Sequence, residues 1–285
     1  MSARTHRYSE ADFDFMALLG ATLFKPTEGK YMRLTKPSLL LASTLAFALS
    51  GFAPAQAAPQ VKNVVIVHGA LADGSGWRKV YDLLTARKYK VTIVQQPMTS
   101  LQDDVQATRR ILALQDGPSI LVGHSYGGMV ITEAGNANNV AGLVYIAAFQ
   151  PDAGETLLEL AAKMPAATKG ISATADEFLY LDPKVYAEDF AADLPREDAE
   201  FMARSQVFPA KVSFDTDIKE AAWRARKSWA LVATDDRAIH PDLMRMMARR
   251  AGSESVEVKA SHAVFMSQPK AVADLIEDAA EALSK

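Results

Sequence analysis

The sequence predicts an α/β fold with a mostly parallel sheet of about six strands and helices on both faces. Two observations support this prediction. From residue 61 onward, short runs rich in β-branched residues alternate with longer amphipathic segments. This is the pattern of a parallel sheet whose strands are connected by covering helices. In addition, one apolar run passes through a glycine-rich turn at residues 123–128 directly into a helical segment.

The individual elements follow from these patterns in chain order. The expected strands cover residues 63–68, 91–95, 119–123, 142–147, 229–233 and 255–259. The expected helices cover residues 77–87, 101–114, 127–137, 241–250 and 269–283. In the second helix, Val105, Ile111 and Leu112 fall roughly on one side and the charged residues fall elsewhere. This helix is therefore expected to bury one stripe and to expose the rest.

The alternation of strands and helices stops between about residues 151 and 226. No clear strand is visible there, and the chain reads as several short helices separated by Pro165, Pro183, Pro195 and Pro209. Neither a repeat nor a low-complexity linker separates this segment from the rest. The sequence therefore predicts a helical cap, inserted before the penultimate strand of a single domain that spans residues 58–285.

The N-terminal residues have the features of an export signal. A short basic stretch begins at Met32, an apolar run covers residues 39–49, and residues 55–57 read A-Q-A, a small-x-small cleavage pattern. The apolar run is shorter than the roughly 20 residues of a membrane-spanning helix. We predict that residues 32–57 are a signal peptide and that residues 1–31 are an upstream extension outside the fold. The mature chain would then be periplasmic or secreted, without a stable membrane anchor.

Composition argues against several classes of function. The formal net charge is -3, the isoelectric point is about 6.0, and the basic residues are scattered, which disfavours nucleic acid as a partner. The chain has no cysteine, so disulfides, thiolate nucleophiles and cysteine-based zinc sites do not arise. The histidines lack a close metal-ligand spacing such as H-x-x-x-H. We expect neither a metal nor another cofactor.

The glycine-rich turn reads G-H-S-Y-G at residues 123–127. A G-x-S-x-G motif between a strand and a helix is typical of the nucleophile turn of the α/β-hydrolase fold. Parallel sheets also use glycine-rich turns for packing alone, but the preceding strand, the following helix and the additional Gly128 favour the catalytic interpretation. Ser125 is the candidate nucleophile, and the amide of Tyr126 lies at a helix N-terminus, where it can bind an oxyanion.

A serine nucleophile needs a base, an acid that orients the base, and a second oxyanion donor. In this fold the acid precedes the base along the chain, and the base follows the last strand; His262 has that position. Asp235 and Asp236 both follow the strand at 229–233 and are both candidate acids. The loop after the first strand supplies the second oxyanion donor in this fold, which we assign to the amide of Ala70.

These segments resemble the esterases grouped with methyl salicylate esterases and plant hydroxynitrile lyases within the α/β-hydrolase superfamily. The match covers nearly all of the chain after the signal peptide and is weakest in the cap. The matching segments are residues 68–70, Trp77, and residues 123–129, 147–152, 234–241, 261–262 and 267–269. The resemblance favours Asp236 as the triad acid, because in this family the acid is commonly followed by three or four residues and a proline, here Pro241. Asp235 would then be a turn former.

Two positions separate the hydrolases from the lyases in this resemblance. The lyases have a threonine where this chain has Gly69, and a lysine directly after the catalytic histidine where this chain has Ala263. Because a cyanide leaving group needs a nearby positive charge, an alanine there disfavours the lyase. Relatives that attack with aspartate, such as epoxide hydrolases and haloalkane dehalogenases, are disfavoured by Ser125.

The sequence therefore predicts a serine hydrolase that cleaves a small carboxylic ester through an acyl-enzyme. The triad would be Ser125, His262 and Asp236. The residues expected to contact the substrate are Leu71, Met129, Phe149 and Tyr180. Two alternatives stay open at this level: a cofactor-free perhydrolase or acyltransferase that uses the same triad, and a non-catalytic relative that binds a small ligand.

Overall fold

The computed structural model describes residues 60–284. Within this range six strands form one sheet in the order β2-β1-β3-β4-β7-β8, and every neighbouring pair is parallel. The predicted six-stranded α/β sheet is confirmed, with all six strands parallel. The predicted upstream extension (residues 1–31) and signal peptide (residues 32–57) lie outside the described residues.

The strands of the sheet are short, and the central ones are mainly apolar. Their bounds are β1 (Asn63–Val67), β2 (Lys90–Val94), β3 (Ser119–Ser125), β4 (Val140–Ala148), β7 (Lys227–Ala233) and β8 (Glu254–Val258). Every residue of β1 and β3 is buried. Central strands of a parallel sheet are covered on both faces, which is why these runs are apolar without alternation.

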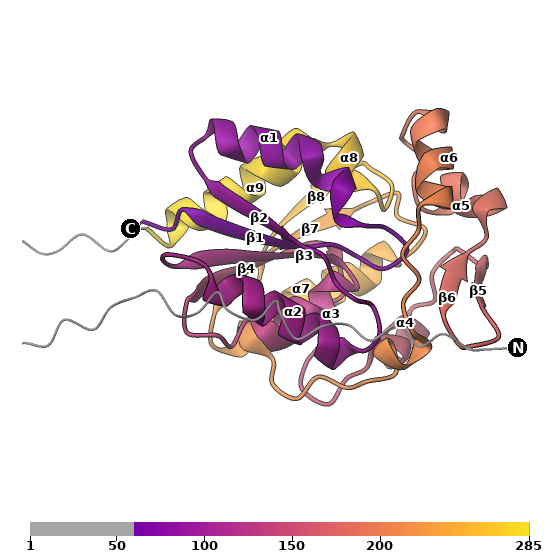
Figure 1. Ribbon diagram of the computed structural model, residues 1–285, viewed down its shortest axis with the longest axis horizontal. Helices are drawn as coiled ribbons and strands as arrows, with labels where there is room; N and C mark the ends of the chain where they lie inside the picture. The colour runs from indigo at the N-terminus through magenta and orange to yellow at the C-terminus, as the bar shows by residue number, and fades with distance from the viewer. Residues whose placement is uncertain (1–59, 285) are drawn as a thin grey trace, which may run out of the picture. The chain divides into compact units, whose positions relative to one another are not determined.

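Helices cover both faces of this sheet (Figure 1). They are α1 (Arg78–Ala86), α2 (Leu101–Ala113), α3 (Gly127–Ala134), α7 (Pro241–Ala251), α8 (Val264–Ser267) and α9 (Pro269–Ala282), with a 3₁₀ turn, η1 (Gly74–Trp77), before α1. In Figure 1, α1 and α9 lie on one face, and α2 and α3 lie on the other. The helix predicted over residues 127–137 ends earlier, at Ala134, because its C-cap is Gly135, a poor helix former.

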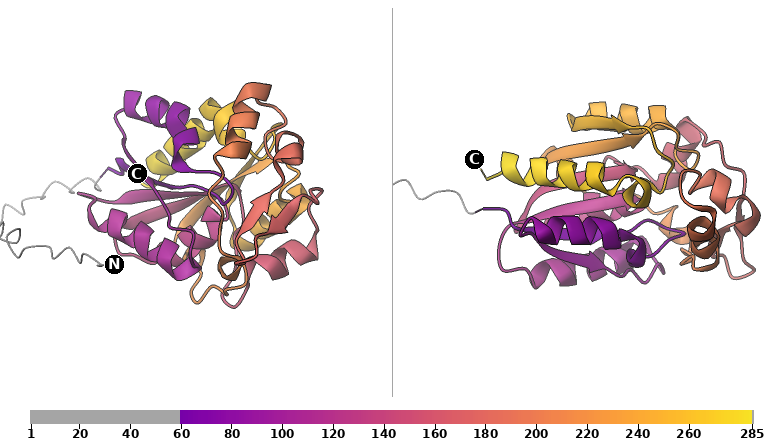
Figure 2. Two further views of the ribbon diagram at one scale, coloured as in Figure 1. Left: turned by 45° about the vertical axis from the view of Figure 1, so that its right-hand side comes forward. Right: turned by 90° about the horizontal axis from the view of Figure 1, so that it is seen from above.

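The segment between β4 and β7 lies beyond the carboxyl ends of the strands (Figures 1 and 2). It contains α4 (Leu157–Lys163), β5 (Ile171–Ala173), β6 (Leu179–Leu181), α5 (Pro183–Asp189), α6 (Arg196–Arg204) and two 3₁₀ turns, η2 (Lys211–Ser213) and η3 (Ala222–Arg224). The cap contains helices as predicted, but it also contains the antiparallel pair β5 and β6, where the sequence showed no clear strand. Strands of three residues are too short to give a visible period of two.

The strand order reverses direction between β1 and β3. The chain leaves β1 toward β2 on one side, and β3 leads to β4 on the other. In open parallel sheets such a reversal creates a crevice at the carboxyl ends of the two strands. The loop after β1 and the serine at the end of β3 therefore meet at this crevice. No helix within residues 60–284 has both the length and the apolarity that a bilayer crossing demands.

Candidate active site

The candidate nucleophile lies on a tight turn between β3 and α3. Ser125 is the last residue of β3 and has a φ of 54°, a left-handed conformation that costs a residue with a side chain about 1–3 kcal/mol. A Cβ on Gly123 would lie 2.6 Å from the carbonyl oxygen of Gly127, and a Cβ on Gly127 would lie 2.6 Å from that of Val67. The turn therefore depends on both glycines, and it leaves Ser125 at the carboxyl edge of the sheet.

Two hydrogen bonds join Ser125, His262 and Asp236. Nδ1 of His262 lies 2.6 Å from Oδ2 of Asp236, and Nε2 of His262 lies 2.8 Å from Oγ of Ser125. A carboxylate can only accept, so Nδ1 carries the proton and Nε2 accepts from the Ser125 hydroxyl. The structure thus brings together the three side chains that the motifs selected, with a proton acceptor against the serine.

Asp236 belongs to the acid loop, residues 234–241, which follows β7. Its second carboxylate oxygen, Oδ1, accepts from the amides of Ala238 at 2.8 Å and Ile239 at 2.9 Å. These bonds leave Oδ2 directed at His262. Asp235, the other candidate acid, is exposed and makes no hydrogen bond to His262 among the described residues. Of the two aspartates, the structure places Asp236 beside the imidazole.

The buried side chain of His124 forms a hydrogen bond to the histidine loop, residues 259–263. Its Nε2 lies 3.0 Å from the carbonyl oxygen of His262, and because a carbonyl only accepts, Nε2 carries the proton. Burial, followed by the neighbouring His262, holds the pKa of His124 well below its ordinary value. His124 is therefore a neutral donor that fixes the main chain of His262.

The other histidines lie apart from this network. His240 caps α7, with its Nδ1 accepting from the amide of Asp242 at 3.1 Å. Burial lowers the pKa of His68, whose carbonyl oxygen accepts from Nε2 of Gln96 at 2.7 Å. Within residues 60–284, no three His, Asp or Glu side chains gather closely enough to hold a metal ion.

The two candidate oxyanion donors flank Ser125. Ala70, on the oxyanion loop (residues 68–77), and Tyr126 both line the cavity that contains Ser125. In the described part of the chain, neither backbone N–H donates to another protein group. Leu71, next to Ala70, has a φ of 64°. The strained residue turns the oxyanion loop sharply beside the serine.

A buried carboxylate holds the side chain of Tyr126. Asp104 of α2 accepts from the Tyr126 hydroxyl at 2.7 Å and from the amide of Met98 at 2.8 Å. Burial raises the pKa of Asp104 to about 6, although these two hydrogen bonds act in the opposite direction. Burial and the adjacent carboxyl raise the pKa of Tyr126 well above its ordinary value. Asp104 thereby anchors the residue whose amide is the candidate oxyanion donor.

Sequence reasoning missed Asp104 because it assigned the charged residues of that helix to solvent. Asp104 is fully buried instead. The available signal was the tyrosine at position 126, since a buried Tyr hydroxyl usually has a hydrogen-bond partner. That signal shows that a partner is needed but does not say which residue provides it.

The cavity above Ser125, here called the triad cavity, has a volume of about 390 Å³. Of the residues predicted to contact substrate, Leu71 and Phe149 line it, together with Ser125 and His262. Most of its remaining wall comes from the cap and is apolar: Leu157, Leu158, Ala161, Ile171, Leu179, Phe190 and Phe214. The cavity therefore fits an apolar group attached to the carbon that Ser125 would attack.

Met129 and Tyr180, the other two residues predicted to contact substrate, do not line the triad cavity. Met129 is completely buried in α3 and does not line it. Tyr180 alternates with Leu179 along β6, so that Leu179 borders the cavity while the ring of Tyr180 stacks on Phe208 at 5.6 Å between ring centres. One residue of the pair faces the site, and sequence alone did not say which.

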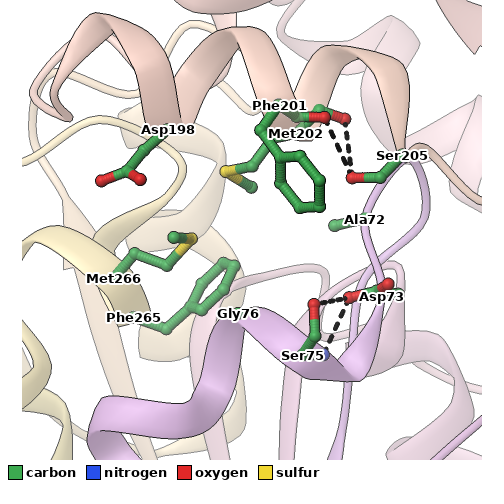
Figure 3. A pocket seen from close by; sticks show the side chains of 10 residues that line it. All are labelled: Ala72, Asp73, Ser75, Gly76, Asp198, Phe201, Met202, Ser205, Phe265 and Met266. Atoms are coloured by element: carbon green, nitrogen blue, oxygen red, sulfur yellow. Dashed lines mark hydrogen bonds between the residues drawn. The ribbon is translucent and has the colours of Figure 1, made fainter.

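A second cavity of about 240 Å³ lies where α6 meets the oxyanion loop and α8. Figure 3 shows Phe201 and Met202 of α6 across from Phe265 and Met266, with Asp73 bonded to Ser75 below. None of the triad residues lines this cavity. It is a gap between the cap and the core rather than part of the triad cavity.

Comparisons with known proteins agree with the fold. Residues 64–275, well over half of the chain, match the model of the alpha/beta hydrolase family. Salicylic acid-binding protein 2 of Nicotiana tabacum is 26% identical over 252 residues, which are 76% of this chain and 96% of that protein. A pyrethroid hydrolase of Sphingobium wenxiniae is 37% identical over 101 residues, covering 31% of this chain and 36% of that protein.

Solved structures give the same result over a longer span. A pyrethroid hydrolase from Sphingobium faniae JZ-2 superposes with a TM-score of 0.68 at 25% identity, covering 78% of this chain and 98% of that one. Polyneuridine aldehyde esterase superposes with a TM-score of 0.67 at 20% identity, covering 77% and 99%; at that identity the likeness shows the fold alone. The chain is thus related to esterases, and the family predicted from its motifs is confirmed: this protein belongs to the alpha/beta hydrolase family.

Proposed function

We propose that this protein is a serine esterase that cleaves a small carboxylic ester with an apolar or aromatic part. The observation that carries the proposal is the hydrogen-bonded chain from Asp236 through His262 to Ser125 at the floor of a mainly apolar cavity. This arrangement combines a nucleophile, its base and an orienting acid, which is what acyl transfer to serine requires.

The first half of the reaction forms an acyl-enzyme. The Ser125 hydroxyl proton moves to Nε2 of His262 while Oγ bonds to the ester carbonyl carbon, and the negative charge collects on the carbonyl oxygen. The amides of Ala70 and Tyr126 donate to that oxygen. As the tetrahedral carbon collapses, its bond to the alcohol oxygen breaks, and His262 gives its proton to the leaving alcohol.

The second half of the reaction releases the acid. A water molecule gives a proton to Nε2 of His262 and attacks the acyl carbon, and the same two amides hold the new oxyanion. The bond to Ser125 Oγ then breaks, and the proton returns from His262 to the serine. Throughout both halves Asp236 stabilises the positive imidazolium by accepting from Nδ1, without itself taking the proton.

The lining of the triad cavity suits a substrate that is uncharged or weakly anionic. Its charged lining residues are Lys169 and Lys211, both exposed, and its inner wall is apolar. Burying apolar substrate surface there contributes about 25 cal/mol per Å². One relative at 25% identity is named as a pyrethroid hydrolase, which supports a hydrolytic reaction. These features together favour ester hydrolysis with an apolar acyl or alcohol group.

The surroundings of His262 disfavour the lyase reaction. The next residue, Ala263, is completely buried and carries no charge that could stabilise a departing cyanide. At the other side of the site, a Cβ on Gly69 would lie 2.7 Å from Cβ of Ser125. A threonine at this position would therefore require the loop to shift away from the nucleophile.

The location of the enzyme is part of the proposal. We infer from the basic start at Met32, the apolar run and the A-Q-A pattern that the chain is exported and acts in the periplasm or outside the cell. N-terminal sequencing of the protein recovered from cell fractions tests this inference. A mature form that begins after Ala57 in the exported fraction is expected; an uncleaved chain in the cytosol would contradict it.

The esterase proposal is tested with Ser125→Ala and a panel of p-nitrophenyl esters of increasing acyl length. We expect the variant to lose about six orders of magnitude in kcat while it keeps the fold of the parent. A fluorophosphonate probe should label the parent at Ser125 and leave the variant unlabelled. Retention of most of the activity by Ser125→Ala, or a parent that neither hydrolyses the esters nor takes the label, would overturn the assignment.

A further inference from the structure

One short helix of the cap contacts three of the four segments that carry the proposed catalytic groups: the oxyanion loop, the acid loop and the histidine loop. Helix α5 places Tyr186, Asp189 and its C-cap residue Phe190 at positions i, i+3 and i+4, which lie on one face of a helix. All three residues are buried. We propose that this face, here called the α5 clamp, sets the geometry of the active site and that Tyr186 and Asp189 are positioning residues. The inference rests on the proposed function.

The first contact of the α5 clamp is to the oxyanion loop. The Tyr186 hydroxyl donates to the carbonyl oxygen of Leu71 at 2.8 Å, and the amide of Leu71 donates to Val207, also in the cap, at 3.1 Å. Leu71 has a left-handed backbone and directly follows Ala70. Both polar groups of the strained residue are thus held by the cap, which fixes the direction of the Ala70 amide.

The second contact is to the acid loop. Asp189 accepts from Nε of Arg237 at 2.9 Å and from the Thr168 hydroxyl at 2.7 Å. Arg237 directly follows Asp236, and its carbonyl oxygen accepts from the amide of Thr168 at 2.9 Å. A carboxylate at the C-terminal end of a helix is disfavoured by the helix dipole. Asp189 is therefore unfavourable for the stability of α5 itself. Its hydrogen bonds to Arg237 and Thr168 account for its position.

The third contact is to the histidine loop. The carbonyl oxygen of Phe190 accepts from the amide of Ala263 at 2.9 Å and from the Ser261 hydroxyl at 3.2 Å. These two donors flank His262 on both sides. The ring of Phe190 also stands nearly perpendicular to the imidazole, with 4.7 Å between the ring centres. The main chain and the ring of the proposed base are held by the same residue.

Each clamp contact reaches a residue next to a proposed catalytic group. A shift of about 1 Å in such a group can lower a rate by about a hundredfold. Tyr186 and Asp189 touch the loops rather than the reacting atoms, so loosening them should slow the chemical step and leave binding of the apolar part of the substrate in place. The clamp thus predicts a loss in kcat with little change in KM.

The test compares Tyr186→Phe and Asp189→Asn with a matched control in the same helix. Asp182→Ala removes the N-cap of α5, where the Asp182 carboxylate accepts from the amide of Lys184 at 2.9 Å. This change weakens α5 without removing a contact to a catalytic loop. Ester hydrolysis, the rate of fluorophosphonate labelling at Ser125 and the thermal unfolding midpoint are measured for all three variants and the parent.

We expect each clamp variant to lower kcat and the labelling rate by about tenfold or more, with KM within about twofold of the parent. Asp182→Ala should lower the unfolding midpoint and keep kcat within about twofold. Tyr186→Trp keeps a hydrogen-bond donor, but the larger indole does not fit the buried position of the Tyr186 ring. This variant should therefore be as slow as Tyr186→Phe. Should Asp189→Asn fail to fold, Tyr186→Phe still tests the contact of the clamp to the oxyanion loop.

Clamp variants with parental kcat in an active enzyme would overturn the proposal. So would a loss of kcat in Asp182→Ala as large as theirs, because the effect would then follow helix stability. A parent that neither hydrolyses esters nor takes the label would instead overturn the esterase proposal and the clamp with it. The two failures are therefore distinguishable.

Discussion

At the scale of single residues, two positions of backbone strain lie in the candidate active site. Ser125 and Leu71 both have positive φ values, 54° and 64°, although neither is glycine. Each such residue costs about 1–3 kcal/mol and persists because its surroundings hold it. Here the surroundings are visible: Gly123 and Gly127 leave space for the serine turn, and cap residues bond both polar groups of Leu71.

Asp104 gives a prediction at the same scale. Its pKa is raised to about 6 from 3.8, so between these values the folded state binds more protons than the unfolded state. The stability contribution of Asp104 is therefore present in acid and is lost as the pH rises toward 6, by about 3 kcal/mol. Asp104→Asn should gain stability relative to the parent over this interval, as measured by urea unfolding from pH 4 to 7.

The neighbouring Asp103→Asn is the control for this measurement. Hydrogen bonds from Thr99 and Ser100 lower the pKa of Asp103, so its contribution to stability has the opposite dependence on pH. That dependence lies below pH 3.8, where the unfolded carboxyl takes up its proton, so the difference between Asp103→Asn and the parent should stay nearly constant from pH 4 to 7. A difference between Asp104→Asn and the parent that stays constant from pH 4 to 7 would contradict the account of Asp104.

Residue types with a local motif could be predicted from sequence, and residues that act through distant contacts could not. Ser125 lies in a five-residue pattern, and His262 follows the last strand of a recognisable series. The sequence did not show that Met129 and Tyr180 lie outside the lining of the triad cavity, because the orientation of a side chain depends on the register of its own element. Asp189 gives no local signal, since its partners Thr168 and Arg237 lie far away along the chain.

At the scale of elements, the packing of α3 depends on close approach of its first turn to β4. A Cβ on Gly128 would lie 1.9 Å from the carbonyl oxygen of Phe149 and 3.0 Å from Cβ of Ala148. Neither the strand nor the helix can move without opening the core, because α3 is buried along nearly its whole length. The second glycine after the nucleophile thus sets the distance between helix and sheet.

We predict that Gly128→Ala destabilises the protein by about 3 kcal/mol or more, since overpacking of this kind usually costs about 1–3 kcal/mol and here involves backbone atoms. Urea unfolding measures the loss. Gly117→Ala is the matched control, because its Cβ would find no atom closer than 3.6 Å. Equal unfolding midpoints for the two variants would show that the close approach of α3 is not needed.

Some helices and strands could be predicted from the sequence, and the pair β5 and β6 could not. The six strands and five main helices were predicted because buried strands and amphipathic helices leave long apolar patterns. The pair β5 and β6 was missed, since each strand has three residues and their turn depends on Glu177 in a left-handed conformation and on the Thr174 hydroxyl accepting from the amide of Phe178. Such turns follow from packing more than from residue type.

At the scale of the whole molecule, Glu155 ties the start of the cap to the core. Its carboxylate accepts from Arg250 of α7 at 2.7 Å, from Lys163 at 2.8 Å and from the amide of Asp152 at 2.9 Å. Burial raises the pKa of Glu155, but these bonds outweigh burial and lower it to about 2 from 4.5. The carboxylate is therefore more stable in the folded chain than in the unfolded one.

Because the pKa of Glu155 is lowered on folding, its stabilisation is fully present above pH 4.5 and is lost as the pH falls toward 2. Glu155→Gln should therefore lower the free energy of unfolding by up to about 3 kcal/mol at pH 7, and the difference from the parent should shrink in acid. Urea unfolding at pH 7 and pH 3 measures this. Glu281→Gln, at an exposed position, should match the parent at both pH values; a Glu155 variant that does so too would refute the role.

The hydrogen bond between Ser125 and His262 joins residues that are 137 positions apart. A contact of this kind forms late in folding, after the chain between its ends has been ordered. During synthesis the nucleophile turn leaves the ribosome long before the base does, and N-terminal parts fold first. The proposed triad is therefore incomplete until the segment that carries His262 has folded. Activity of the proposed esterase would then also report that folding is complete.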